Sequence, residues 1–297
     1  MTNIAAIIGG GVIGGGWTAR FLLNGWNAQV FDPDPDAERK IAEVLDNARA
    51  SYPGLCDSAL PPEGKLSFHE TLSEAVDGAI WVQESVPERL ELKRKVYQTL
   101  QAHVADGAVI ASSTSGFKPS ELQSCATQQD QILVAHSLLL AQKTLKSIGK
   151  YSLHVRSEFD ALIADRLLEA VWREALWLIN DGIATTAEVD EAIRMGFGLR
   201  WAQMGLFETY RIAGGEAGMK HFLAQFGPAL GWPWTKLMDV PELTEALVTA
   251  IAEQSDEQSG AFSIRELEAQ RDANHVGMMR ALKARSHGAG AVLNSAD

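Results

Sequence analysis

A glycine-rich turn close to the start of the chain constrains the fold more than any other feature of the sequence. Residues 4–8 are an apolar run of strand length, and Gly9, Gly11 and Gly14 follow at the spacing G-x-G-x-x-G, leading into a helical stretch over residues 12–23. In a dinucleotide site the first glycine permits the tight turn. The second lets the backbone approach the pyrophosphate, and the third lets the helix lie close to the strand. The phosphates then contact the free N–H groups and the positive end of the helix dipole.

The residue that would select the cofactor ends the second strand of this unit. A second apolar run, residues 28–31, is followed by Asp32, whose carboxylate can accept both ribose hydroxyls of an adenosine and would repel a 2′-phosphate. No arginine lies between Asp32 and Arg39, so NAD is favoured over NADP. Glycines alone would be a weak signal, but strand, glycine turn, helix, strand and acid in this order predict a βαβ dinucleotide-binding unit.

Composition and charge exclude several classes of protein. The 297 residues are enough for two domains, and 46% apolar with 22% charged residues are ordinary values for a soluble globular protein. The formal net charge of −12 argues against nucleic acid as a partner, because no basic face is available to neutralise phosphates. No apolar run is long enough to cross a membrane, and no signal peptide is expected. Neither the two cysteines nor the histidines have metal-ligand spacing, so we expect a cytoplasmic protein without a metal site.

Short apolar runs alternate with amphipathic helices from residue 1 to 156, which predicts an α/β domain with a Rossmann-type, doubly wound, mostly parallel sheet. Ligands bind beyond the carboxyl ends of the strands in such sheets. The residues found at these ends are Gly9, Asp32, Glu84, Ser115 and His136. Beyond the first βαβ unit we expect strands over residues 66–68, 79–83, 108–111, 132–135 and 153–155, and helices over residues 36–50, 71–76, 87–104 and 138–148.

The alternation then stops, and residues 157–297 are expected to form an all-helical domain. Apolar residues recur there at helical spacing, and Thr185 with Glu188 forms a capping box at the start of one helix. We expect helices over residues 167–179, 185–195 and 263–283, and a frayed tail over residues 286–297.

Five segments carry a resemblance to a known family. They are Gly-Gly-Gly-Val-Ile-Gly-Gly-Gly-Trp (9–17), Gln-Glu-Ser-Val-Pro-Glu-Arg-Leu-Glu-Leu-Lys (83–93), Ser-Ser-Thr-Ser-Gly (112–116), Asp-Arg-Leu-Leu-Glu-Ala-Val-Trp-Arg-Glu-Ala-Leu-Trp (165–177) and Arg-Trp-Ala-Gln-Met-Gly-Leu-Phe-Glu-Thr-Tyr-Arg (200–211). Through them the chain resembles the 3-hydroxyacyl-CoA dehydrogenase family. The resemblance implies an N-terminal NAD domain, a helical C-terminal domain through which two subunits form a homodimer, and reversible oxidation of a 3-hydroxyl to a ketone. It is greatest to the branch that oxidises L-carnitine, which is then the implied substrate.

Carried over residue by residue, the resemblance assigns roles to the glycine turn and the strand ends. Ser115 would hydrogen-bond the reacting oxygen, and His136 would be the general base. Considered without the resemblance, Ser115 could simply cap the helix that begins near Lys118, and a histidine at such a position is often structural. Contacts to NAD are implied for Gly9, Gly11, Val12, Ile13, Gly14, Asp32, Glu84, Lys93 and Ser113.

The sequence departs from the family pattern directly after His136. The family continues with Pro-x-Asn-Pro and an extended stretch whose glutamate orients the imidazole, whereas the next acid here is Glu158. In a comparable triad, spoiling the orienting acid costs about ten-thousandfold in rate. Glu158, Asp160 or Asp165 could substitute. Otherwise the shortened protein binds NAD without efficient turnover.

Candidates for substrate binding lie in the helical domain. Asp165 stands where the family has an asparagine, as in the carnitine branch, and Arg200 could bind the carboxylate of carnitine. Five aromatic residues could form a cage for its trimethylammonium group, although aromatics at such spacings also pack helical cores and dimer interfaces. These residues are Trp201, Phe207, Tyr210, Trp232 and Trp234.

Three functions are therefore open on the sequence. The first is NAD-dependent oxidation of L-carnitine to 3-dehydrocarnitine. The second is an NAD-binding dimer of the same fold with impaired or no catalysis, because the active-site segment is truncated. The third is oxidation of another short 3-hydroxy acid or of a 3-hydroxyacyl-CoA.

Overall fold

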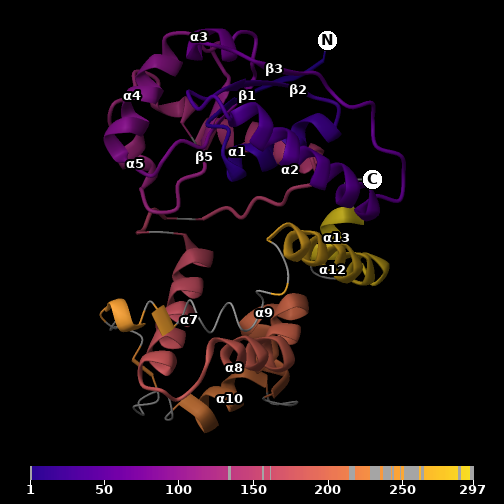
Figure 1. Cartoon of the computed structure of the whole chain (residues 1–297), viewed down its shortest axis with the longest axis vertical. Helices are drawn as coiled ribbons and strands as arrows, with labels where there is room; N and C mark the ends of the chain where they lie inside the picture. The colour runs from indigo at the N-terminus through magenta and orange to yellow at the C-terminus, as the bar shows by residue number, and fades with distance from the viewer. Residues whose placement is uncertain are drawn as a thin grey trace. The chain divides into compact units, whose positions relative to one another are not determined.

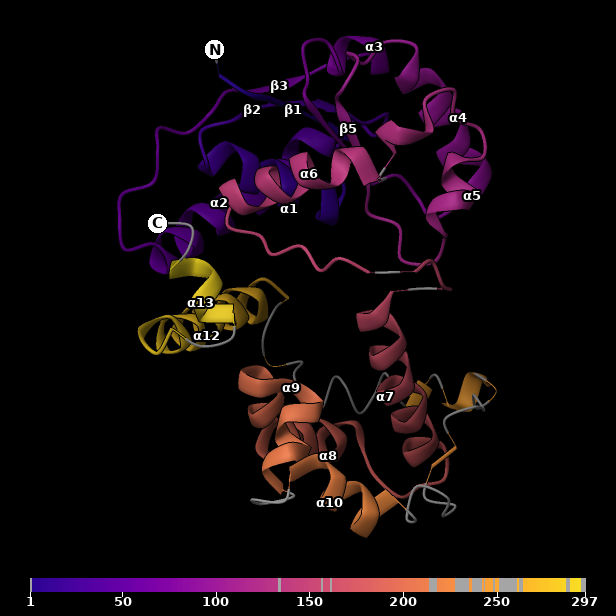
Figure 2. The ribbon, with the colours of Figure 1, turned by 180° about the vertical axis from the view of Figure 1, so that it is seen from behind.

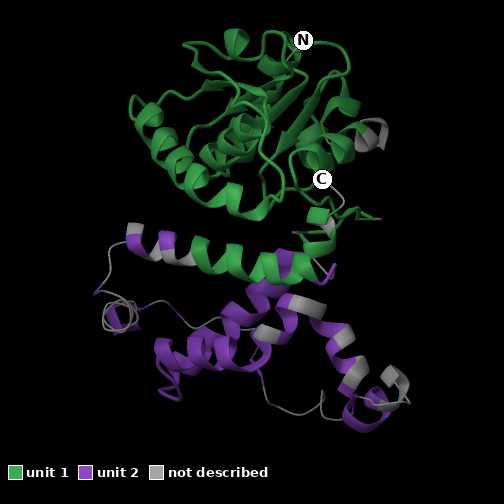
Figure 3. Cartoon of the chain, turned by 90° about the vertical axis from the view of Figure 1, so that its right-hand side faces the viewer, with its two compact units in different colours: residues 1–162, 272–284, 290–297 green, residues 163–271, 285–289 purple. Residues whose placement is uncertain are grey.

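The computed structural model describes residues 2–294 apart from 133–134, 156, 161, 214–217, 228–234, 237–241, 243, 248, 251–260, 262–263 and 287–288. The side chains of residues 135–139 and of some residues in the later helices also lie outside the description. The chain divides into two compact units, each of which is described by itself (Figure 3). Unit 1 holds residues 1–162, 272–284 and 290–297, and unit 2 holds residues 163–271 and 285–289.

Unit 1 is built on a sheet of five parallel strands in the order β3-β2-β1-β4-β5 (Figure 1). The central strand β1 pairs Ile8 with Phe31 on one side and with Glu84 on the other. This arrangement confirms the predicted Rossmann-type parallel sheet. The strands are β1 (Ile4–Ile8), β2 (Asn27–Phe31), β3 (Leu66–Phe68), β4 (Trp81–Glu84) and β5 (Val109–Ser112).

Helices cover both faces of this sheet (Figures 1 and 2). Side chains alternate along a strand, so Ala5 and Ile7 of β1 pack into one apolar core and Ala6 and Ile8 into another. The first core includes residues of α1 (Val12–Leu23), α2 (Ala37–Ser51) and α6 (Ala135–Ser147). The second includes residues of α3 (Leu72–Ala75), α4 (Leu90–Gln101) and α5 (Pro119–Gln123). A central strand buried on both faces is apolar throughout, as the sequence of β1 is.

The predicted strand over residues 153–155 is wrong, and the one over residues 132–135 is contradicted at Ala135, while residues 133–134 lie outside the described part of the chain. After the short 3-10 turn η2 (Gln129–Gln131), Ile132 makes one isolated parallel bridge with Ile110, and α6 already begins at Ala135. Gln123 Nε2 donates to the Ile132 carbonyl at 2.6 Å, so a side chain occupies an acceptor at the point where a sixth strand would continue. Residues 153–155 have no regular structure, so the predicted crossover helix leads to no further strand.

The sequence of α6 explains in part why a helix forms here. Residues 138–146 are mostly leucine, alanine, glutamine and lysine, which favour helix over strand. Ala141 and Ile148 are buried in the core around α1, with Leu145 packed against it. Burial of one apolar face stabilises a short helix more than the helix propensity of its residues does. Helix α6 accordingly begins at Ala135, three residues before the predicted start.

Unit 2 is helical in the part that the structure describes. Its elements include α7 (Ile163–Asn180), α8 (Thr186–Glu191), α9 (Gly198–Ala213) and α10 (Gly218–Phe226). The capping box is confirmed, with Thr185 Oγ1 accepting from Glu188 N at 3.3 Å and Glu188 Oε2 accepting from Thr185 N at 2.8 Å. The helix does not continue to Met195 in α-form, because residues 192–197 form a wider π turn in which Gly196 leaves helical geometry. Among the described residues no helix is both long and apolar enough to cross a membrane.

The end of the chain returns to the first unit. Helix α12 (Ile264–Ala284) matches the predicted helix to within one residue at each end, and α13 (Ala289–Asn294) stands where a frayed tail was expected. Arg280 Nη1 donates to Gly54 O at 2.7 Å, and Lys283 Nζ lies 2.9 Å from an Asp57 carboxylate oxygen. These contacts bind α12 to the turn η1 (Tyr52–Leu55) and the residues after it. The predicted domains, 1–156 and 157–297, stay a prediction, and the compact units divide the chain differently.

Candidate cofactor and active site

The three motif glycines meet different surroundings. A Cβ atom on Gly14 would lie 1.8 Å from the Gly9 carbonyl oxygen, and one on Gly9 would lie 2.6 Å from the Ser85 carbonyl oxygen. Gly9 also has a φ of 101°, which side chains rarely tolerate. A Cβ atom on Gly11 would meet no atom within 4 Å. The first and third glycines are thus required by packing, whereas the second leaves open space beside the backbone. This cradle fits a pyrophosphate.

The first turn of α1 lies next to this space. Its N-cap residue Gly11 provides no side-chain cap, and no acidic residue lies in the first turn. The N–H groups at the start of the helix are therefore left for an anion, which the helix dipole also favours. Val12 and Ile13 are exposed to 81% and 58%, an unusual state for two apolar side chains at a helix start. A bound cofactor would cover them.

Asp32 lies against the glycine turn. Its Oδ2 accepts from the Gly10 N–H, and its Oδ1 accepts from the Asp34 N–H at 2.7 Å. The carboxylate is thereby held at the end of β2, with lone pairs left for ribose hydroxyls. The next cations along the chain are occupied elsewhere, because Arg39 pairs with Asp36 and Lys40 pairs with Asp34. The site thus holds one fixed carboxylate and offers no adjacent cation of this segment to a 2′-phosphate.

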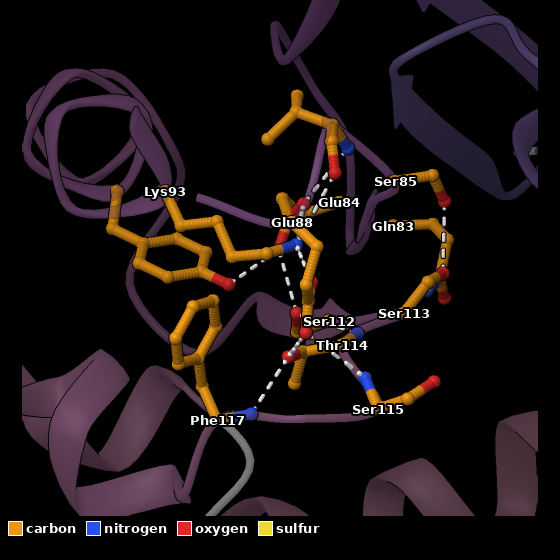
Figure 4. A network of polar contacts seen from close by, with 12 residues as sticks. Gln83, Glu84, Ser85, Glu88, Lys93, Ser112, Ser113, Thr114, Ser115 and Phe117 are labelled. Atoms are coloured by element: carbon orange, nitrogen blue, oxygen red, sulfur yellow. Dashed lines mark hydrogen bonds and ion pairs between the residues drawn. The ribbon is translucent and has the colours of Figure 1, made fainter. Parts of the chain in front are cut away.

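Glu84, at the end of β4, is completely buried and accepts four hydrogen bonds. Oε1 accepts from Val86 N and from Lys93 Nζ, both at 2.8 Å. Oε2 accepts from Tyr97 Oη at 2.5 Å and from Ser112 Oγ at 2.6 Å. Burial raises the pKa of the Tyr97 hydroxyl, and the Glu84 charge raises it further. The carboxylate therefore connects β4, α4 and β5 at the carboxyl ends of the strands, where ligands bind in such sheets (Figure 4).

Lys93 connects this buried carboxylate to a second one. Its side chain is 1% exposed, and Nζ lies 3.1 Å from Glu88 Oε2 and 2.8 Å from Glu84 Oε1. Glu88 Oε1 accepts from Thr114 Oγ1 and from the backbone N–H groups of Ser115 and Gly116. Burial of Glu88 opposes its ionisation, but these hydrogen bonds and the Lys93 charge outweigh that effect and lower its pKa.

A second set of polar contacts lies on the other side of the serine-rich turn. Gln83 Nε2 donates to Ser113 Oγ at 2.9 Å, and Ser113 Oγ lies 2.8 Å from Ser85 Oγ (Figure 4). Trp81 Nε1 donates to the Gln83 amide oxygen at 3.2 Å, which fixes the orientation of that amide. Ser113, predicted to contact NAD, is therefore held by neighbouring side chains at the ends of β4 and β5.

Ser115 differs from the other hydroxyl residues of this turn. The hydroxyls of Ser112, Ser113 and Thr114 are all engaged by neighbouring side chains. Within the described part of the chain, no hydrogen bond of the Ser115 hydroxyl is found, and the residue is exposed. Ser115 thus presents an unengaged, exposed hydroxyl on the turn that follows β5, where a substrate oxygen could bind it.

The surroundings of the predicted base are described only in part. His136 lies in the first turn of α6, and its side chain is outside the described residues. Two of the acids that could orient it have other partners. Glu158 accepts from both the N–H and the hydroxyl of Ser120, and Asp160 pairs with Lys118 at 2.8 Å. Asp165, in the first turn of α7, has a buried Oδ2 without a hydrogen-bond partner in the described part of the chain.

The predicted substrate residues on α9 are exposed. Arg200, Trp201, Phe207 and Tyr210 all lie on α9, and Phe207 is 74% exposed. Trp201 packs on Phe197 with ring centroids 4.4 Å apart, and Tyr210 stacks on Phe222 at 4.7 Å. Trp232 and Trp234 lie outside the described residues. No aromatic cage can be traced in the described part of unit 2, and the aromatic set stays a prediction.

Sequence reasoning missed two members of the network. Glu88 lies inside the segment 83–93 that carried the resemblance, but no spacing rule links it to residues 114–116. Tyr97 follows Lys93 by one helical turn, which is a signal for a shared helix face. Read together with the buried end of β4, that signal could have identified Tyr97 as a partner of Glu84.

Comparison with known families gives one match for each half of the chain. The 3-hydroxyacyl-CoA dehydrogenase NAD binding domain matches residues 4–142, and the C-terminal domain of the same family matches residues 162–251.

Curated relatives match nearly the whole chain. A Ruegeria pomeroyi protein named L-carnitine dehydrogenase/betainyl-CoA thioesterase is 67% identical over 99% of this chain and 65% of its own length. The chain thus spans about two thirds of that relative. L-carnitine dehydrogenases of Mesorhizobium japonicum and Pseudomonas aeruginosa are 50% and 45% identical, with 85% and 95% of their lengths covered. The first alignment runs over 315 positions, more than the 297 residues of this chain, so that relative has residues within the matched span that this chain lacks.

Solved structures at low identity share the fold. The crystal structure of 5-formyl-3-hydroxy-2-methylpyridine 4-carboxylic acid 5-dehydrogenase aligns with a TM-score of 0.76 at 23% identity, covering 95% of this chain and 99% of that one. A 3-hydroxyacyl-CoA dehydrogenase from Archaeoglobus fulgidus aligns with a TM-score of 0.55 at 16% identity, covering 94% and 100%.

Proposed function

The chain belongs to the 3-hydroxyacyl-CoA dehydrogenase family with NAD as its cofactor, and on this premise we propose that it oxidises the 3-hydroxyl of L-carnitine to 3-dehydrocarnitine. The observation that supports L-carnitine as the substrate is the 67% identity, over almost the whole chain, to a relative whose name includes L-carnitine dehydrogenase. Two further relatives of that name, most of whose length is covered, support the same substrate. The protein acts as a homodimer in the cytoplasm.

The described side chains supply the oxygen-binding part of this reaction. Ser115 Oγ donates a hydrogen bond to the substrate oxygen, because the turn leaves this hydroxyl unengaged. His136 takes the hydroxyl proton as general base. Gly9 to Gly14 and Asp32 hold the dinucleotide, and Glu84, Lys93 and Ser113 shape the end of the sheet beside it. NAD, when bound, supplies the acceptor for the hydride that leaves C3.

Recognition of carnitine falls to unit 2 in this proposal. Arg200 binds the carboxylate, and an aromatic set that includes Trp201, Phe207 and Tyr210 contacts the trimethylammonium group. Asp165 places a carboxylate at the start of α7, and its unpartnered oxygen supports a role toward a cationic substrate. The acidic balance of the whole chain is compatible with such a substrate.

One observation favours a second function, an NAD-binding dimer with impaired or no catalysis. Helix α6 begins at Ala135, and Glu158 and Asp160 are bound to Ser120 and Lys118 rather than left available to orient an imidazole. The aligned relative has residues that this chain lacks, and we place that difference directly after His136. A third function keeps the enzyme and changes the substrate to another short 3-hydroxy acid or a 3-hydroxyacyl-CoA.

One assay separates these functions. NADH formation is followed at 340 nm with L-carnitine, 3-hydroxybutyrate or a 3-hydroxyacyl-CoA, and NAD binding is measured in parallel by thermal shift. We expect turnover with L-carnitine, and a loss of about a thousandfold or more in kcat for His136→Ala, because general-base and orienting contributions are of that size. A thermal shift without turnover on any substrate would establish the non-catalytic function. Full activity of His136→Ala would reject the base.

A further inference from the structure

We infer that Glu88 is a positioning residue for Ser115, since its carboxylate fixes the turn that presents the catalytic hydroxyl. This inference rests on the proposed function. Glu88 follows β4, Ser115 follows β5, and the two residues are 27 positions apart in sequence. The contact is therefore tertiary and joins the loops after two neighbouring strands (Figure 4).

The backbone of the turn shows why an acceptor is needed there. Each N–H group from Ser113 to Lys118 donates a hydrogen bond. Four of these bonds go to the end of β4 or to acceptors within the turn and α5. The other two, from Ser115 at 3.2 Å and Gly116 at 3.0 Å, both go to Glu88 Oε1. Successive N–H groups that point at one oxygen form an anion site, and a carboxylate supplied by the chain itself occupies it.

The carboxylate is held in place from its other side. Lys93 lies 3.1 Å from Glu88 Oε2 and is almost fully buried. Glu84 does not depend on Lys93 alone, because its oxygens also accept hydrogen bonds from Val86, Tyr97 and Ser112. One ammonium thus serves two carboxylates, a buried one that anchors the sheet and a half-exposed one that reaches the turn. A charged acceptor on a charged, buried support is stiffer than a neutral one.

The consequence concerns the position of one oxygen. The Ser115 side chain has no hydrogen bond of its own in the described part of the chain, so its place is set by the backbone that carries it. Release of the Ser115 and Gly116 N–H groups would let that backbone move. A misplacement of about 1 Å can cost about a hundredfold in rate. A glutamine at position 88 keeps the shape of the side chain but loses its charge. Its amide group also carries hydrogens, which would repel the N–H groups of Ser115 and Gly116 wherever they face them.

The test compares Glu88→Gln with Glu91→Gln. Glu91 lies three residues further along, in the first turn of α4, its side chain is 79% exposed, and it pairs with Arg94. For Glu88→Gln we expect kcat to fall about tenfold, while KM for the 3-hydroxy substrate and Kd for NAD change less than about twofold. Amide hydrogen exchange at Ser115 and Gly116, followed by NMR, should quicken about tenfold, with Tm held within about 2 °C. Glu91→Gln should change none of these quantities.

A double-mutant cycle tests whether Glu88 acts through Ser115. In a Ser115→Ala background, Glu88→Gln should lower kcat less than about twofold, because the group it positions is gone. Equal losses of kcat in both backgrounds would overturn the inference, and so would unchanged exchange at Ser115 and Gly116. If the unmodified protein turns over none of the three substrates, the proposed function fails by itself. The exchange measurement then still decides whether Glu88 holds the turn.

Discussion

At the scale of single residues, the ammonium group of Lys93 pairs with two carboxylates, those of Glu84 and Glu88. Lys93 and Glu84 are 1% and 0% exposed, so the pair forms an ion bridge that water does not reach. Such a pair contributes little net stability compared with apolar residues of the same size, because desolvation of both charges offsets their attraction. Removing one partner is different, since the other charge then stays buried without compensation.

Lys93→Met should therefore lower the free energy of unfolding by about 3 kcal/mol or more, because it leaves the Glu84 carboxylate buried beside an apolar chain. Lys95→Met is the matched control, since Lys95 is exposed two positions further along the same helix and should change stability by less than about 0.5 kcal/mol. Urea unfolding followed by circular dichroism measures both. A cost for Lys93→Met no larger than that of the control would show that the ion bridge is not what holds β4, α4 and β5 together.

At the scale of elements, α1 combines two kinds of glycine. Gly14 and Gly15 are buried, and a Cβ atom on either would lie within 3.2 Å of the Gly9 carbonyl or the Val44 side chain. Gly11 and Gly16 are exposed and would meet nothing within 4 Å. Packing against β1 and α2 explains the first pair. The open space at Gly11 lies at the start of the helix, where the proposed cofactor binds, whereas Gly16 lies more than a turn further along.

Gly11→Ala and Gly16→Ala should separate these causes. Gly11→Ala should raise Kd for NAD about tenfold or more, because its methyl group occupies the space beside the pyrophosphate, while the free energy of unfolding stays unchanged. Gly16→Ala should leave Kd unchanged and stabilise the protein by about 0.5–1 kcal/mol, because it removes backbone entropy within a helix. Isothermal titration with NAD and urea unfolding give the two readings. Equal affinities in both variants would place the pyrophosphate away from this turn.

At the scale of the whole molecule, the chain forms two compact units, and the first is completed by residues from the far end of the sequence. Lys283 is 6% exposed and binds Asp57 and the Leu55 carbonyl within unit 1. Lys236 binds Asp181 at 2.6 Å within unit 2. A ligand that binds only the folded form of one unit stabilises that unit, by about 2.7 kcal/mol at one hundred times Kd.

Calorimetry should accordingly resolve two unfolding transitions, one whose midpoint temperature NAD raises and one whose midpoint temperature it leaves unchanged. Lys283→Met should lower the NAD-sensitive transition by a few degrees, because it removes about 1 kcal/mol of charged hydrogen bonding from unit 1. Lys236→Met should lower only the other transition, and by less, because its ion pair is exposed. If Lys283→Met shifted the NAD-insensitive transition instead, the end of α12 would not belong to the cofactor-binding unit.

The sequence by itself determined the features that local patterns encode. The G-x-G-x-x-G turn with its flanking runs predicted β1, α1, β2 and the position of Asp32, because turn chemistry and side-chain periodicity act within a few residues. Thr185 with Glu188 predicted a capping box for the same reason. The same patterns failed at Ala135 and at residues 153–155, where a short apolar run is as compatible with a buried helix or an extended segment as with a strand.

Tertiary structure decided which groups meet. Only packing could show that α6 starts at Ala135, that Gln123 takes the Ile132 carbonyl, and that residues 272–284 complete the first unit. The same holds for Lys93 between Glu84 and Glu88, and for Glu88 beneath the Ser115 turn. These contacts join residues that are 5 to 28 positions or more apart, and no spacing rule of the sequence predicts them. The Lys93–Glu84 pair, moreover, is shielded from water only once the sheet and its helices have assembled.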